Sequence, residues 1–332
     1  MDARERRLLN GFQRDFPLCA APYAAVAEAL DTTESWVIRA LRSFIAAGVV
    51  GRVGAVFRPG SIGASTLAAM AVPPARLAAI AHRVSAHPGV NHNYEREHRF
   101  NLWFVANAPD ASRLQSLLAQ VERETVLPVL SLPLLREYHI DLGFDLDDTR
   151  AERPAPRPGV ARAWRPDAEQ TRIVAALQDG LPLQARPYAA IAERAGLARD
   201  EGEQRVLRHL REWLRDGIVK RLGVIVRHRP LGYIANVMAV WDVPDDAVDA
   251  AGETLAREAG VTLCYRRARA LPAWPYNLFC MVHGRDRGEV EGTLDAIGAR
   301  TGLDGHPHAR LFSREAFKQD GARHFAARAL HG

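Results

Sequence analysis

The sequence contains an internal repeat that spans most of its length. Residues 16–28 read FPLCAAPYAAVAE, and residues 181–193 read LPLQARPYAAIAE. Three further segments recur in the same order: 48–63 as 217–232, Gly89-Val90 with Tyr94 as Gly260-Val261 with Tyr265, and Phe100-Asn101-Leu102 as Tyr276-Asn277-Leu278. The offset between the copies grows from 165 to 176 residues, as expected of small loop insertions between two copies of one domain. This repeat predicts a chain of two like halves.

Each copy begins with the pattern of a winged helix-turn-helix, which is three helices followed by a β wing. Pro22 and Pro187 stand where a first helical turn tolerates proline, and Asp31-Thr32-Thr33 is a turn and cap signal. The helices and wing are predicted over 3–14, 22–30, 34–47 and 49–57 in the first copy, and over 167–178, 187–195, 200–216 and 219–226 in the second.

The rest of each copy reads β-α-β-β-α-β, a ferredoxin-like order. The elements are predicted over 66–72, 75–86, 89–96, 100–106, 111–124 and 129–135, and again over 233–243, 246–259, 261–267, 276–283, 287–299 and 308–313. Such a sheet needs a partner on its free face, and the other copy supplies one. The predicted fold class is therefore α+β, a tandem repeat of winged helix-turn-helix plus ferredoxin-like domains forming an intramolecular pseudo-dimer.

The domain boundaries follow from the repeat and from one proline-rich stretch. Residues 1–60 and 167–230 are the predicted winged helix-turn-helix domains, and residues 61–147 and 231–332 the ferredoxin-like domains. Between the copies, residues 148–166 contain Pro154, Pro156, Pro158 and Pro166 and are typical of an extended linker.

Polar side chains with useful chemistry gather on the predicted strand at residues 90–96. Alternation places Val90, His92, Tyr94 and Arg96 on one face and Asn91, Asn93 and Glu95 on the other, and His98 joins the first face if the strand continues. Imidazoles, a phenol and a guanidinium transfer protons or hold anions. The alternative interpretation is a solvent-facing hairpin, but the following run, Phe100 to Ala106, is unusually aromatic for that.

Charge and cysteine content narrow the function classes. The net charge is +5 and only Lys220 and Lys318 are lysines, so the basic side chains are nearly all arginines, which favour carboxylates or phosphates. A GC-rich genome explains the arginines equally well. Cys19, Cys264 and Cys280 form no CxxC pair, so neither a metal site nor a disulfide framework is indicated. No signal peptide or apolar run of 18 residues is present, which makes a cytoplasmic location without a membrane segment the expectation.

The helix-turn-helix pattern raises the question of DNA binding. The first candidate recognition helix offers only Arg39 and Arg42 among apolar residues. The second carries Arg205, Arg208, Arg211 and Arg215, but these alternate with Glu201, Glu203, Glu212 and Asp216, a pattern typical of a solvated helix. We therefore favour a retained fold without DNA binding.

Three motifs resemble one known family. The domain order is similar to that of the Lrp/AsnC regulators, and HNYEREHRFNLWF at 92–104, REYHIDLGFDL at 136–146 and CYRRARALPAWPYNLFCMVHGRDR at 264–287 resemble its enzymatic branch, the sirohaem decarboxylases of haem d1 and alternative haem biosynthesis. The resemblance covers nearly the whole chain and implies a fused form of a two-subunit enzyme that removes carbon dioxide from two acetate side chains of sirohaem, giving didecarboxysirohaem.

The resemblance implies a site for a flat, apolar substrate fringed with carboxylates. For that chemistry we expect His92 and His98 to be general acids, with Tyr94 and Arg96 orienting the acetate; an alternative role for one histidine is axial ligation of the substrate iron. The resemblance assigns substrate binding to the following residues: Arg99, Asn101, Trp103, Tyr265, Arg266, Arg267, Trp274, Tyr276 and Asn277. The macrocycle itself can accept the electron pair, so no cofactor is implied beyond the iron of the substrate.

The halves differ at the key positions, because His92 and His98 correspond to Leu263 and Arg269. We therefore expect one competent site on the first copy and a mainly structural second copy. His139 and His283 are interpreted as structural, and His306, His308, His324 and His331 as solvent-facing. Partners implied besides sirohaem are a second homologous decarboxylase pair and a homo-oligomer. A ligand-sensing transcriptional regulator and a tetrapyrrole carrier without turnover stay open as alternatives.

Overall fold

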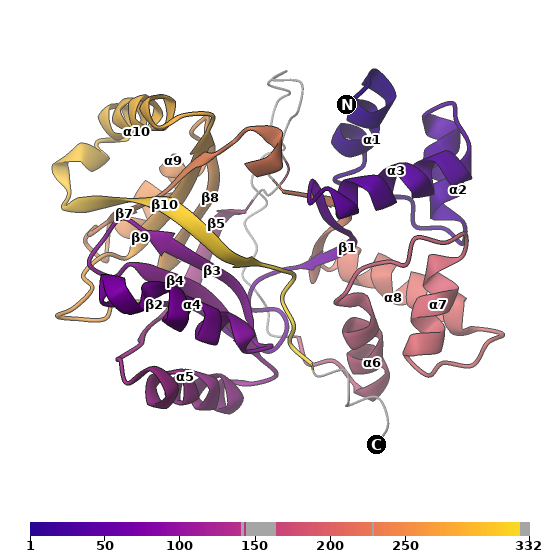
Figure 1. The fold of residues 1–332 in the computed structure, drawn as a ribbon, viewed down its shortest axis with the longest axis horizontal. Coiled ribbons are helices and arrows are strands. Elements are labelled where there is room, and N and C mark those ends of the chain that lie inside the picture. The colour runs from indigo at the N-terminus through magenta and orange to yellow at the C-terminus, as the bar shows by residue number, and fades with distance from the viewer. Residues whose placement is uncertain (141–142, 144–163, 228, 326–332) are drawn as a thin grey trace.

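The computed structural model describes residues 1–140, 143, 164–227 and 229–325. All but the last three residues of the predicted linker at 148–166 lie outside this range. The described chain forms two lobes, a helical lobe and a β-barrel lobe (Figure 1). Each lobe takes one part from each sequence copy, so the copies are interleaved rather than placed end to end.

The helical lobe contains both winged helix-turn-helix units. Its helices are α1 (Ala3–Gly11), α2 (Pro22–Ala29), α3 (Glu34–Ala46), α6 (Ala168–Leu177), α7 (Pro187–Arg194) and α8 (Gly202–Arg215). Asp2 and Asp167 open α1 and α6 with the same capping box, which satisfies the first amides of each helix. Leu8, Val37 and Leu41 of the first copy belong to the same buried core as Ile173 and Leu210 of the second.

The two wings pair with each other. Strand β1 (Val50–Phe57) runs antiparallel to β6 (Val219–Val226), with Gly54 opposite Gly223. The backbone of each wing strand is therefore paired with that of the other wing. The pair forms one two-stranded sheet on the side of the helical lobe that faces the barrel (Figure 1).

The other described strands close into an eight-stranded barrel. They are β2 (Ala64–Met70), β3 (Val90–Arg96), β4 (Leu102–Ala108), β5 (Leu130–Ile140), β7 (Ala235–Trp241), β8 (Val261–Arg267), β9 (Leu278–Gly284) and β10 (His308–Gln319). Their order around the barrel is β10-β3-β4-β2-β5-β8-β9-β7.

The last strand of each copy crosses into the other half. β5 pairs with β2 through residues 130–133 and then with β8 through residues 134–140, and β10 pairs first with β7 and then with β3. Both strands are longer than the sequence patterns predict, 130–140 against 129–135 and 308–319 against 308–313, because their ends pair with the other copy.

Helices cover the outside of the barrel. α4 (Leu77–Ala86) and α5 (Ala111–Thr125) cover the first half, and α9 (Val248–Leu255) and α10 (Arg287–Thr301) cover the second. Short 3-10 turns lie at Pro74–Arg76, Arg229–Leu231 and Leu303–Gly305. A separate inner cluster that includes Trp103, Trp274 and Phe279 fills the barrel interior.

The predicted fold class is confirmed: the two copies form winged helix-turn-helix and ferredoxin-like units in an intramolecular pseudo-dimer. Within the described part of the chain, no helix combines the length and the apolar character needed to cross a membrane.

Candidate functional site

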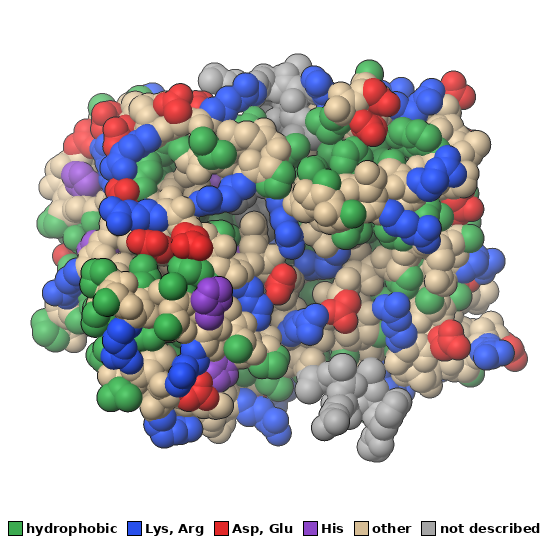
Figure 2. Space-filling model, viewed as in Figure 1, with side chains coloured by type: hydrophobic (Ala, Val, Ile, Leu, Met, Phe, Trp, Pro, Cys, Tyr) green, Lys and Arg blue, Asp and Glu red, His purple; other side chains and the backbone are tan. Residues whose placement is uncertain are grey.

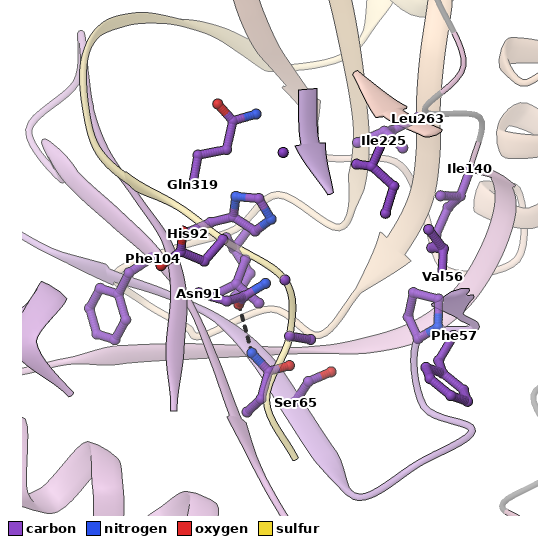
Figure 3. Close-up of a pocket in the computed structure, with 18 of the residues that line it drawn as sticks. Val56, Phe57, Ser65, Asn91, His92, Phe104, Ile140, Ile225, Leu263 and Gln319 are labelled. Carbon is purple, nitrogen blue, oxygen red and sulfur yellow. Dashed lines mark hydrogen bonds between the residues drawn. The ribbon is translucent and has the colours of Figure 1, made fainter. Parts of the chain in front are cut away.

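A cavity of about 580 Å³ lies where the open end of the barrel meets the paired wings. β3, β4, β8 and β9 contribute its barrel wall, β1 and β6 its other wall, and residues 319–324, which run from the end of β10, one edge. Figure 3 shows His92 and Asn91 on one side of this space, with Leu263, Ile225 and Val56 across from them. The cavity is thus built from both copies and both lobes.

Strand β3 directs His92, Tyr94 and Arg96 into the cavity, the face on which alternation places them. The His92 and Tyr94 rings stack with centroids 6.2 Å apart, and the Arg96 guanidinium lies 5.6 Å from the Tyr94 centroid. Asn93 points the other way and donates to the Ala81 carbonyl on α4. His92, Tyr94 and Arg96 thus form a continuous row along β3.

The predicted alternation is wrong at the start of β3. A register irregularity between Val90 and His92 places one extra residue in the strand. Val90 therefore packs into the outer core under the helices, and Asn91, which alternation puts on the outer face, lines the cavity beside His92. A bulge is a local backbone feature that residue spacing does not reveal.

Strand β8 repeats this row in the second half. Leu263, Tyr265 and Arg267 line the cavity at the positions of His92, Tyr94 and Arg96, and a register irregularity again precedes Leu263. The Arg267 guanidinium lies 4.7 Å from the Tyr265 centroid. The cavity therefore holds two Tyr–Arg pairs, but a histidine leads the row only in the first half.

The two arginines of these rows are fixed by the crossing strands. Arg96 donates to the Leu311 carbonyl of β10 at 3.0 Å, and Arg267 donates to the Leu132 carbonyl of β5 at 2.8 Å. Burial lowers the pKa of Arg96 to about 10 and also lowers the pKa of Arg267, yet both stay cationic near neutrality. The Nε atom of Arg267 is buried and has no hydrogen-bond partner in the described part of the chain.

The cavity as a whole is strongly basic. Seven arginines line it, namely Arg52, Arg58, Arg96, Arg221, Arg227, Arg267 and Arg323, against two carboxylates, Asp179 and Asp320. Figure 2 shows basic side chains gathered around the hollow where the lobes meet. Aromatic and aliphatic lining such as Trp103 and Met238 accompanies this charge. An apolar anion with several carboxylates matches such a surface.

Burial and neighbouring charges favour the neutral form of the His92 imidazole. Its pKa is lowered from 6.5 to about 4, first by burial and then by Arg52 and Arg227 from the wings, while Asp320 acts in the opposite direction. The Arg52 and Arg227 side chains line the cavity, and Arg227 donates to the carbonyl of Gln319, the residue that pairs with His92. Anions bound between them would offset their charge and favour the protonated imidazole.

Several residues that the sequence analysis assigns to the site lie outside the cavity lining. Strand β3 ends at Arg96, so His98 does not continue the row; its Nδ1 accepts from the Phe100 amide and its ring packs 5.3 Å from Trp274. Arg99 is exposed and donates to the Ala273 carbonyl. Both residues belong to the hairpin turn at the far side of the aromatic barrel core.

The remaining predicted binding residues have structural contacts. Asn101 and Asn277 each bridge to the backbone of a neighbouring loop, at Val72 and Val243. Alternation turns Arg266 outward, where it pairs with Asp245 and Asp249. Trp274 is fully buried against Trp103, and Tyr276 packs on Trp274. Of the predicted set, the cavity brings together the following: His92, Tyr94, Arg96, Trp103, Tyr265 and Arg267.

Sequence reasoning missed the contributions of the wings and of the C-terminal segment. Arg52 and Arg221 occupy the same place in the repeated pattern Arg-x-Gly, a signal that the repeat offered. His324 is not solvent-facing as predicted, because its segment is held by Gln178, whose side chain accepts from the His324 and Phe325 amides. Burial lowers the pKa of His324 to about 4. Among the described residues, no cluster of His, Cys, Asp or Glu is arranged to hold a metal ion.

Comparison with known proteins agrees with this architecture. The model of the AsnC-like ligand binding domain matches residues 61–139 and 230–318, and that of the siroheme decarboxylase NirDL-like HTH domain matches residues 5–50 and 170–219. A solved siroheme decarboxylase NirDL, in co-complex with an iron-uroporphyrin III analogue, superposes with a TM-score of 0.69 at 27% identity, covering 98% of this chain and 96% of that one.

Curated relatives occur both as one chain and as two. The siroheme decarboxylase NirDL subunit of Paracoccus pantotrophus is 46% identical over 97% of both chains. The separate NirL and NirD subunits of Stutzerimonas stutzeri are each 49% identical and match 44% and 45% of this chain. Similarity at this level over nearly the full length, together with the two matching domain models, shows that this chain belongs to the sirohaem decarboxylase family.

Proposed function

We propose that this protein removes carbon dioxide from the acetate side chains of sirohaem, leaving methyl groups and giving didecarboxysirohaem. The observation that carries the proposal is the cavity between barrel and wings, which combines seven arginines with an aromatic and aliphatic wall. Sirohaem is a flat apolar ring fringed with carboxylates, so it needs both kinds of contact at once. The iron arrives with the substrate, and the proposal involves no separate cofactor.

The arginines divide by position into two groups that suit two tasks. Arg96 is buried and Arg267 is half-buried in the barrel wall, and both are held by backbone carbonyls, so they are preorganised to fix the reacting acetates. Arg52 and Arg227 extend from the wings and can hold carboxylates on the opposite side of the ring. Tyr94 and Tyr265 lie against the barrel arginines and add a hydroxyl to each acetate position.

His92 is the proposed proton donor for the methyl group formed in the first half. When the bond to the carboxylate breaks, carbon dioxide leaves and the electron pair stays on the methylene carbon, where the macrocycle delocalises it. The imidazolium proton then completes the methyl group. Burial, and after it the charges of Arg52 and Arg227, disfavour the imidazolium, and substrate carboxylates beside these arginines would offset the charge contribution and favour proton uptake by His92.

The other predicted residues have supporting roles in this proposal. Trp274 packs against Trp103, and Tyr276 packs against Trp274. His98 packs against Trp274 from the hairpin turn. Asn101 and Asn277 hold the loops that follow β2 and β7. Arg99 and Arg266 influence the site through charge and folding rather than contact.

Anaerobic incubation of the purified protein with sirohaem, followed by mass analysis of the tetrapyrrole, tests the proposal. The expected result is loss of one and then two carbon dioxide masses. His92→Gln should slow the loss of one of the two carbon dioxide molecules by about a hundredfold or more, as is typical for loss of a general acid, whereas His98→Gln should retain most of the activity. The exposed His308→Gln is the matched control. An unchanged tetrapyrrole that stays bound would instead indicate a carrier.

The alternative function, a DNA-binding regulator, receives no support from the wings. β1 and β6 pair edge to edge, and Arg52 of β1 and Arg227, which directly follows β6, line the cavity. A wing that reads DNA must be free to lie along the duplex backbone. Retention on DNA at defined salt is the direct check, and the expected result is none.

A further inference from the structure

The second half of the cavity carries its own imidazole, at a different position from the first. By strand register, Trp103 and Val105 of β4 face Tyr94 and His92, while Phe279 and Met281 of β9 face Tyr265 and Leu263. Asn107 and His283 come two residues later on their strands and are therefore equivalent, and both line the cavity.

The equivalent positions form equivalent cross-strand contacts. In the first half, the Asn107 amide donates to the Asn91 side-chain oxygen at 2.6 Å. In the second half, Thr262 takes the place of Asn91, and its Oγ1 lies 2.9 Å from His283 Nδ1. Thr262 Oγ1 also donates to the Met281 carbonyl at 3.0 Å, which leaves it as the acceptor for an Nδ1 proton. The histidine ring is thus held in one orientation and one tautomer.

From this arrangement we propose that His283 is the proton donor for the second acetate, acting beside Tyr265 and Arg267. This proposal rests on the proposed function. Because Leu263 stands at the position of His92, the sequence alone predicts a mainly structural second copy. The structure shows that the row in the second half keeps its Tyr–Arg pair and gains an imidazole one strand away. Each half then has one guanidinium, one phenol and one imidazole facing the same cavity.

The other groups near this position account less well for a second proton transfer. Leu263 cannot transfer a proton. Each half has one of the two tyrosines, Tyr94 in the first and Tyr265 in the second. A tyrosine therefore does not compensate for the histidine that the β8 row of the second half lacks. His324, the third histidine on the cavity, lies beside Gly63, which directly precedes β2 of the first half, so close that a methyl group at Gly63 would be 3.1 Å from its Nδ1. His283 is the imidazole that the second half itself supplies.

The proposed step is the same as in the first half. The bond between the methylene carbon and the carboxylate breaks, carbon dioxide leaves, and the electron pair remains on the carbon conjugated with the macrocycle. His283 gives its proton to that carbon and regains one from water. No oxidant or reductant is consumed.

The test compares product distributions rather than overall rates. His283→Gln, incubated anaerobically with sirohaem, should accumulate a tetrapyrrole that has lost one carbon dioxide, with the second loss slowed by about a hundredfold or more. His92→Gln should accumulate the other mono-decarboxylated isomer, distinguishable by fragmentation. Thr262→Val keeps the imidazole but removes its acceptor, so it should slow the same step as His283→Gln, to a smaller extent. His308→Gln should behave as the unsubstituted protein.

Two results would overturn the assignment. One is complete double decarboxylation by His283→Gln at the unsubstituted rate. The other is equal loss of both steps, with or without loss of binding of the tetrapyrrole, because a residue that only maintains the fold has no preference between acetates. If the unsubstituted protein itself releases no carbon dioxide, the proposed function fails instead, so the two failures are distinguishable.

Discussion

At the scale of single residues, one extra position in a strand decides which side chains meet the substrate. The bulge at Asn91 turns Val90 outward and leaves both Asn91 and His92 on the cavity. The same irregularity before Leu263 brings Thr262 to His283. Without a bulge, strict alternation would place Asn91 and Thr262 under the outer helices and break both cross-strand contacts.

The lowered pKa of His92 predicts a pH dependence of stability. Because the folded protein holds this proton less tightly than the unfolded chain, the unfolded chain carries more protons between pH 4 and pH 6.5. The free energy of unfolding should therefore rise with pH across that window. His92→Gln should reduce this slope, measured as urea midpoints over the window. His324→Gln should do the same, since its pKa is lowered in the same direction. The exposed His308→Gln should not, and identical slopes in all four proteins would refute the burial of His92.

A second prediction at this scale concerns the end of α5. Val126 has φ 56° and its side chain is 82% exposed, so a β-branched residue occupies the left-handed region without burying its apolar surface. Its counterpart at the end of α10 is Gly302, with φ 73°. Val126→Gly should raise the free energy of unfolding by about 1 kcal/mol, measured by urea denaturation. Gly302→Val is the matched reverse change and should lower it; destabilisation by both substitutions would show that Val126 is not strained.

At the scale of elements, the crossing strands join the two halves. Tyr138 of β5 packs its ring directly over Gly252 of α9 and hydrogen-bonds to Asp249. Farther along the same strand, Ile140 reaches the cavity, and Glu137 pairs with Arg58 and Lys220 of the wing region. One strand thus connects the second ferredoxin-like unit, the cavity and the wings.

The contact between β5 and α9 yields the third prediction. A methyl group at Gly252 would overlap the Tyr138 ring, so Gly252→Ala should cost roughly 1–3 kcal/mol of unfolding free energy. Tyr138→Leu removes the obstructing ring and should recover much of that loss when both changes are combined. A double-mutant cycle by urea denaturation measures this coupling. Strict additivity of the two substitutions would mean that β5 adjusts its position instead.

Local sequence patterns predict elements well where contacts are local. Strands 219–226 and 261–267 match residue for residue, because their alternation and flanking glycines suffice. The ends of β5 and β10 are not predicted because REYHI at 136–140 and the residues after Ser313 are largely polar, and these residues become strand only by pairing with the other copy. The wing arginines were missed for a related reason: nothing in VGRVGAVF indicates that the opposite lobe lies above it.

At the scale of the whole molecule, the cavity exists only when both halves are assembled. Its lining includes His92 and Arg96 from the first copy, Arg267 and His283 from the second, and wing residues from each. Three antiparallel pairings cross between the copies, β1 with β6, β5 with β8, and β10 with β3. The covalent connection therefore keeps two interdependent halves at a high effective concentration rather than joining independent domains.

The final prediction divides the chain. Residues 1–147 and 164–332, co-expressed as separate polypeptides, should purify as a one-to-one complex, because all three crossing pairings remain available to them. Size-exclusion chromatography with light scattering gives the stoichiometry. Unlike the intact chain, the complex should dissociate on dilution, since the tether no longer holds the halves together.

A truncated second fragment is the control for this experiment. Ending it at Phe312 keeps the pairing of β10 with β7 but removes residues 313–319, which pair with β3. Strand β3, which carries His92, Tyr94 and Arg96, then has an unpaired edge, and the barrel no longer closes. We expect this fragment to capture the first half poorly and to give no tetrapyrrole turnover. Stable, separately folded monomers of both full-length halves would contradict the interdependence on which the cavity rests.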